Sequence, residues 1–199
     1  MRSELIEPQP GFWTDDELNR WLDEADQDLT EAAQVEAGPF GFSVEAGVED
    51  YALPADFLYA RRVEVGGVRL RPGRIDDRRL PSIEDLLSFP ATGSPDTYFI
   101  YAGRLHLSPV PAAGAQGSLW YYRGSLGLAD DMAEPAIPAR YHRLHILYAV
   151  AQAKRKADDP AYATYTADYT AGRLAMMQEL RDRGEAERFA VVRDDWEVF

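Results

Sequence analysis

Cysteine is missing from this chain of 199 residues. Disulfide bonds, thiolate zinc sites and a thiol nucleophile are therefore excluded. Long apolar runs are missing too, because no stretch of about 18 apolar residues occurs. The N-terminus MRSELIEPQP also lacks the apolar segment of a secretory signal. We therefore expect a soluble protein that is made in the cytoplasm.

Basic residues are few relative to acidic ones. The chain has 34 Asp and Glu against 21 Lys and Arg, which gives a formal net charge of −13. Residues 1–50 hold 14 of the acids and only two bases, Arg2 and Arg20, so the excess lies in the first quarter of the chain. Proteins that grip nucleic acid need clustered bases to neutralise phosphates. The charge argues against tight DNA binding, but it leaves open a protein that stays near DNA without adhering to it.

Hydrophobic residues make up 46% of the chain, and this share indicates a globular protein with a buried core. Helical periodicity begins at Thr14, since Thr14 and Glu17 have the spacing of a capping box. We expect an amphipathic helix over residues 15–37, ended by Gly38-Pro39. Its outer face is a candidate acidic surface, carried by Asp16, Asp23, Asp26 and Glu31.

The middle of the chain has the period of β-strands. Gly66-Gly67 and Ala102-Gly103 each separate two short strand-like segments, which predicts two hairpins. Residues 118–123 predict a third, aromatic strand. We also expect one helical turn at residues 54–58 and a short helix at 82–87.

Helical periodicity returns after Pro138. It predicts one helix to about Ala157 and a second from Pro160 to about Arg183, together an αα-hairpin. The predicted fold class is α+β: mainly a helical bundle, with a small antiparallel β-sheet inserted. The expected organisation is one α+β domain over residues 1–188 and a C-terminal docking tail over 189–199. Within the domain, the helical core covers 12–38 and 138–183 and the β insertion covers 40–123.

Residues that could carry chemistry do not form a recognisable constellation. His142 and His145 have a spacing that metal sites use, but the sequence offers no third ligand and His145 lies on an apolar stripe. Ser125 follows Gly124 directly and so lacks the spacing of a nucleophile elbow. We therefore expect no catalytic residues, no cofactor and no metal. One alternative stays open, a small hydrolase or ligand-binding domain with an acidic pocket around Asp130, Asp131 and His142.

The C-terminal tail is rich in large apolar side chains flanked by acids. Such residues at a chain end either pack back on their own domain or anchor in a partner. The candidate interface residues are Phe189, Val191, Trp196, Val198 and Phe199.

A series of motifs along the chain resembles the head-to-tail adaptor proteins of tailed bacteriophages, also called connector or head-completion proteins. The motifs are residues 12–18 (FWTDDEL), 51–57 (YALPADF), 103–109 (GRLHLSP), 119–123 (LWYYR) and 135–141 (PAIPARY), followed by an Ala-rich and a Tyr-containing helix. They span about residues 12–183.

The resemblance implies a structural virion protein and not an enzyme. Adaptors of this kind form a ring, usually of twelve copies, beneath the portal protein, where they extend the DNA channel and dock tail or stopper proteins. The resemblance also implies a C-terminal segment that engages the portal or a neighbouring copy, a role that falls on residues 189–199 by position. We expect such a protein at the head–tail interface of the virion, and in the host cytoplasm during assembly. The acidic helix face would then line the channel or meet a basic partner. A regulatory interaction module is a third reading of the sequence.

Overall fold

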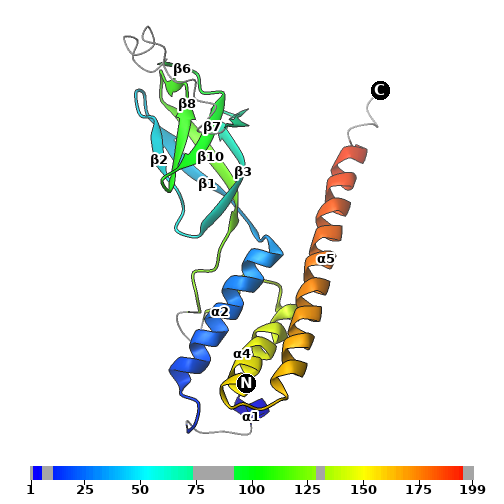
Figure 1. Cartoon of the computed structure of the whole chain (residues 1–199). Coiled ribbons are helices and arrows are strands. Elements are labelled where there is room, and N and C mark those ends of the chain that lie inside the picture. The colour runs from blue at the N-terminus through cyan, green and yellow to red at the C-terminus, as the bar shows by residue number, and fades with distance from the viewer. Residues whose placement is uncertain (1, 6–10, 74–91, 129–132, 195–199) are drawn as a thin grey trace. The chain divides into compact units, whose positions relative to one another are not determined.

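The computed structural model describes residues 2–5, 11–73, 92–128 and 133–194, with side chains described up to residue 183. The chain divides into two compact units. One is a helical unit made of Met1–Val35 and Gly124–Phe199, and the other is a β unit, Glu36–Arg123. Figure 1 shows the helices and strands of each unit. The predicted helix at 82–87 lies outside the described residues.

The helical unit is built on three longer helices. α2 begins where the sequence predicts, since the Thr14 hydroxyl accepts a hydrogen bond from the Glu17 amide and the Glu17 carboxylate accepts one from the Thr14 amide. The helices and helical turn of the unit are α1 (Arg2–Leu5), α2 (Asp15–Ala33), the 3-10 turn η2 (Ala139–Tyr141), α4 (Arg143–Lys156) and α5 (Tyr162–Asp194).

The first and the last predicted helices end at other residues in the structure. α2 ends at Ala33 because Gln34 adopts the left-handed conformation, with φ at 48°. The predicted stop, Gly38-Pro39, instead lies inside the first β-strand. α5 continues to Asp194, beyond the predicted end at Arg183. Gly184 is tolerated within this helix, where good helix formers follow it.

The helices pack through the predicted apolar stripe of α2. Leu18 and Trp21 contact the buried alanines and valine of α4 near one end, and Leu29 packs with Tyr169 and Met176 of α5 near the other. Leu29 and Met176 are fully buried. Burial of these side chains is the main stabilising contribution to the unit.

The β unit encloses a core of its own between two four-stranded sheets. Its strand order is β1-β10-β3-β4 in one sheet and β2-β8-β7-β5 in the other, and β6 pairs with β9 separately. Buried side chains from both sheets form one cluster, with Val63, Leu105, Leu107 and Leu119 at its centre. The strands are β1 (Glu36–Val44), β2 (Asp50–Ala52), β3 (Phe57–Val65), β4 (Val68–Arg69), β5 (Arg71–Pro72), β6 (Thr92–Gly93), β7 (Thr97–Tyr101), β8 (Arg104–Ser108), β9 (Val110–Pro111) and β10 (Ala115–Arg123).

Both predicted hairpins are present. Val65 pairs with Val68 across Gly66-Gly67, whose φ angles of 58° and 80° suit the turn. Tyr101 pairs with Arg104 across Ala102-Gly103. In place of the helical turn expected at 54–58 there is one hydrogen-bonded turn, in which the Phe57 amide donates to the Pro54 carbonyl at 3.1 Å, and β3 begins at Phe57.

The prediction of a mainly helical bundle with a small inserted sheet is wrong. The class is α+β, but the described strands form three sheets, two of four strands and one of two, and they have a core that is separate from that of the helices. The sequence pattern underestimates the size of the β unit for two reasons. β1 contains Gly38, Pro39 and Gly41, which hide its alternation, and it pairs with β10, a strand distant in the sequence.

Candidate functional site

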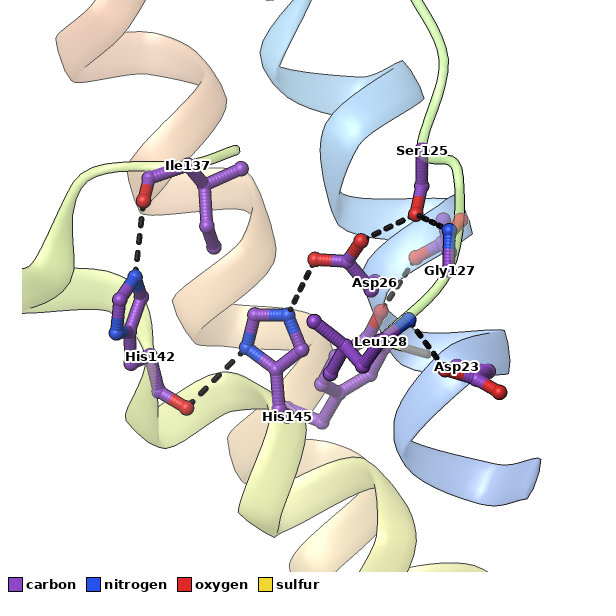
Figure 2. Close-up of polar contacts among 10 residues, drawn as sticks. Asp23, Asp26, Ser125, Gly127, Leu128, Ile137, His142 and His145 are labelled. Atoms are coloured by element: carbon purple, nitrogen blue, oxygen red, sulfur yellow. Dashed lines mark hydrogen bonds and ion pairs between the residues drawn. The ribbon is translucent and has the colours of Figure 1, made fainter. Parts of the chain in front are cut away.

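A polar cluster lies inside the helical unit, where α2, α4 and the segment after β10 meet (Figure 2). Its centre is Asp26 of α2, which is only 2% exposed, beside His145 of α4, which is 3% exposed. Buried charges are costly unless they are paired and hydrogen-bonded. The hydrogen-bond partners of Asp26 and His145 therefore determine what chemistry the cluster can support.

Asp26 uses both of its carboxylate oxygens. Oδ1 lies 2.9 Å from Nε2 of His145, and Oδ2 accepts a hydrogen bond from the Ser125 hydroxyl. The other ring nitrogen of His145, Nδ1, is 3.2 Å from the carbonyl oxygen of His142. Each nitrogen of the ring thus faces an oxygen acceptor, and the imidazolium form can donate to both. The cluster is a buried, hydrogen-bonded acid–histidine pair.

The segment around Ser125 is held against α2 at several points. The Ser125 hydroxyl oxygen accepts a bond from the Gly127 amide at 2.8 Å, and the Leu128 amide donates to Oδ1 of Asp23 at 2.7 Å (Figure 2). Gly127 has φ at 84°, a conformation that other residues rarely adopt. The side chain of Leu126 is 66% exposed. Hydrogen bonds from the Ser125 hydroxyl and the Leu128 amide therefore join the segment to α2.

A second polar contact joins α2 to α5. The Arg173 guanidinium donates to both carboxylate oxygens of Asp28, at 2.6 Å and 2.9 Å, and the Tyr169 hydroxyl donates to the same carboxylate. Burial of the ring, followed by the hydrogen bond to this anion, raises the pKa of Tyr169.

At its N-terminal end, α2 is tied to α4. The Trp13 indole donates to the Ala153 carbonyl at 3.1 Å, and the Lys156 ammonium lies 2.6 Å from Glu17. The bond from Lys156, together with the Thr14 amide, lowers the pKa of Glu17. These contacts and the Asp28 contacts make the three helices one packed unit.

The structure separates the four residues of the predicted acidic surface. Asp16 and Glu31 are exposed. Asp23 is half-buried and bound to the Leu128 amide, and Asp26 is buried in the cluster described above. The four carboxylates therefore do not form one exposed wall, because segment 124–128 covers part of the face on which the sequence places them.

The remaining predicted site residues are described only in part. Phe189 and Val191 belong to the last turns of α5, but their side chains, like Trp196, Val198 and Phe199, lie outside the described residues. Asp130 and Asp131 of the alternative acidic pocket lie outside them as well. His142, the third member of that pocket, lies with Nε2 3.0 Å from the Ile137 carbonyl.

The cluster does not have the geometry of a Ser–His–Asp relay. In such a relay the serine donates to the histidine, whereas the Ser125 hydroxyl donates to Asp26. Across the described ranges, no group of three or more His, Asp or Glu side chains is placed to hold a metal ion. Within the same residues, no helix is both long and apolar enough to cross a bilayer. The cluster instead joins three segments of the unit.

Few local features of the sequence predict this cluster. Asp26 and His145 are 119 positions apart, and Asp26 and Ser125 are 99 apart. One signal was visible, since His145 interrupts the apolar stripe of its helix. A polar residue at a buried position requires a partner, but the stripe does not say which residue supplies it.

Comparison with known proteins completes the description of the chain. A search of curated proteins found no match. A family model described as "SU10 adaptor protein" matches residues 2–193, nearly the whole chain. Its span covers the helical unit, the β unit and almost all of α5. In agreement with the resemblance to phage head-to-tail adaptors found in the sequence, the chain belongs to the SU10 adaptor protein family and is a structural adaptor of a bacteriophage.

Proposed function

We propose that this protein forms a ring beneath the portal, where it extends the DNA channel and provides the docking surface for tail or stopper proteins. The observation that supports the proposal is the match of the adaptor family model to residues 2–193. Association with portal and tail components, and a place in the virion, follow from membership of that family. The proposal adds a ring of twelve copies, its position at the head–tail interface and assembly in the host cytoplasm.

The distribution of charge supports a role next to DNA. The residues of the helical unit include 23 acids and 12 bases, a balance of −11, whereas those of the β unit include 11 acids and nine bases, a balance of −2. An acidic wall repels phosphates and leaves a passing duplex free to slide. We assign this role to the exposed acids of α2, which include Asp16, Glu24 and Glu31.

The C-terminal residues are our candidate for attachment to the portal or to a neighbouring copy. Phe189, Val191, Trp196, Val198 and Phe199 supply large apolar side chains of the kind that anchor interfaces. Acids flank Trp196 on both sides, so a basic pocket is the complementary surface.

Reconstitution with the portal of the same phage tests this function. The full chain should add a ring to purified portal assemblies, seen by electron microscopy of the mixture. A chain that ends at residue 188 should fold but fail to attach, whereas Val68→Ala, at an exposed position of β4, should attach normally. A ring on the portal that forms equally well without residues 189–199 would remove the role of the tail. A chain that does not join the portal and is absent from virions would contradict the adaptor function itself.

The proposed channel surface is tested separately in assembled particles. Exchange of Asp16 and Glu31 for lysine should slow DNA ejection, because the wall would then attract phosphates. The matched exchange Asp16→Asn with Glu31→Gln removes the same two charges without adding attraction, and it should have a smaller effect. Equal ejection rates from particles with the parent chain, the lysine variant and the neutral variant would show that these residues do not line the channel.

A further inference from the structure

Within the helical unit, α4 and α5 leave a hollow between them. It has a volume of about 290 Å³, and its lining residues are Ala151, Gln152 and Arg155 of α4 with Tyr162 and Thr166 of α5. Ala151 and Thr166 have small side chains, which leaves space between the two helices. Small-molecule sites usually enclose about 300–1,000 Å³, so this volume suits one large side chain of a partner better than a cofactor.

The hollow carries a positive charge at the end of α4. Three cations occupy the last turn of this helix. Lys154 lies 2.8 Å from Asp159 and Lys156 lies 2.6 Å from Glu17. Arg155, which is exposed, forms no ion pair within the described part of the chain. A segment that binds here should therefore place an acid beside Arg155.

The α5 side of the hollow offers mainly apolar contact. The Tyr162 side chain is 41% exposed. The Thr166 hydroxyl donates to the Tyr162 carbonyl at 2.9 Å, so its hydrogen is already used within the helix. An exposed aromatic ring in a surface with few charges is typical of the centre of a protein interface. The hollow therefore suits a protein segment that combines a large apolar side chain with neighbouring acids.

The C-terminal residues 195–199 (DWEVF) have this combination, since they hold two acids, no base and the large side chain of Trp196. We infer that Trp196 of one copy enters the hollow between α4 and α5 of a neighbouring copy, with Asp195 and Glu197 beside Arg155. This inference rests on the ring proposed above, and it names the surface that receives the C-terminal tail.

The length of α5 decides which copy supplies the tail. α5 is a continuous helix of 33 residues, whereas α4 has 14, so α5 runs far past α4 (Figure 1). With a rise of about 1.5 Å per residue, Asp194 lies about 42 Å along the helix axis from Thr166. Residues 195–199 span at most about 18 Å when fully extended. The tail therefore cannot reach the hollow of its own copy, and the contact must join two copies.

A contact of this kind has a direction. Each copy offers its tail beyond one end of α5 and its hollow at the other end, so the two surfaces that meet are different. Such heterologous contacts generate a closed ring when the rotation between copies closes, and a filament when it does not. In the ring, every copy donates one tail and receives one.

Disulfide cross-linking of full-length chains tests the contact, because the parent chain has no cysteine. One chain carries Thr166→Cys in the hollow, and a second carries Val198→Cys in the tail. Mild oxidation of their mixture, both free and bound to the portal of the same phage, should join the two chains. The matched control is Thr164→Cys, an exposed position of α5 that does not line the hollow. Its yield with Val198→Cys should be about tenfold lower, since a disulfide requires close Cα atoms.

Charge reversal tests the role of Arg155. Arg155→Glu in the chain with Thr166→Cys should lower the yield about fivefold, and Glu197→Arg in the other chain should restore it. Arg143→Glu, at an exposed position of α4 outside the hollow, should leave the yield unchanged.

Two results would overturn the inference: no cross-link at Thr166 in either sample, or an equal yield at Thr164. Chains that join the portal without this cross-link would retain the adaptor function and exclude the contact. Cross-linked chains that are absent from the head–tail interface would support the contact and contradict the adaptor function.

Discussion

Nε2 of His145 on α4 lies 2.9 Å from Oδ1 of Asp26 on α2 in the interior of the helical unit, where each side chain is only 4% exposed. Buried polar pairs contribute little net stability over apolar replacements, but removing one partner leaves the other polar group buried without its partner. The contact therefore favours one packing arrangement of α2 against α4.

Single replacements of the pair should be costly and the double replacement much less so. Asp26→Leu or His145→Leu should each lower the free energy of unfolding of the helical unit by about 3 kcal/mol. The two changes together should cost less than the sum, since neither side chain of the pair is left buried without its partner. Urea denaturation followed by helical circular dichroism measures all four proteins. Strictly additive losses would show that the two side chains do not interact.

The Tyr169–Asp28 hydrogen bond predicts loss of stability at alkaline pH. Folding raises the pKa of Tyr169, so its contribution is fully present below the ordinary tyrosine pKa of about 10 and is lost as the pH rises above that value. Stability measured from about pH 8 to 11 should fall more steeply for the parent than for Tyr169→Phe. At neutral pH this variant should cost about 1 kcal/mol, the net value of a hydrogen bond. Parallel pH curves would contradict the assignment.

The contacts of Glu17 predict a loss of stability at acid pH. The bonds from the Lys156 ammonium and the Thr14 amide lower the pKa of Glu17, so its stabilising effect is present above the unfolded pKa, near 4.5, and is lost as the pH falls through the lower, folded pKa. Glu17→Gln should therefore reduce the acid dependence of thermal unfolding, and Lys156→Gln should do the same. Arg155→Gln removes a neighbouring cation while sparing the Lys156 contact, and it should leave the acid dependence as in the parent.

Gly117 of β10 occupies a position where a side chain would collide with Phe42 of β1. A Cβ atom there would lie 2.3 Å from Cζ of Phe42, whose ring packs against the core of the β unit. Gly117→Ala should therefore destabilise the β unit by about 1–3 kcal/mol, the usual cost of overpacking. Gly41→Ala, in the same sheet, meets nothing within 4 Å and should change stability little. Chemical denaturation measures the free energy of unfolding of both variants. Equal effects would contradict the prediction, because they would show that Phe42 moves aside without loss of stability.

Local signals in the sequence were sufficient for features that depend on neighbouring residues. The cap at Thr14 and the turn at Gly66-Gly67 were predicted because a few adjacent side chains determine them. Pairing between distant segments was not predictable in this way. Glu36 pairs with Tyr122, and Asp26 binds His145, through contacts that no local pattern encodes. For the same reason the sequence pattern underestimates the size of the β unit and predicts Asp26 on the outer face of its helix.

Electron microscopy of purified virions of the phage that encodes this chain tests the central claim most directly. The adaptor function predicts density for the helical and β units in a ring between the portal and the tail, at one copy per ring position. The ring should be missing from particles assembled without the protein, and these particles should lack tails. Virions that contain no such density, or that assemble complete tails in its absence, would contradict the account.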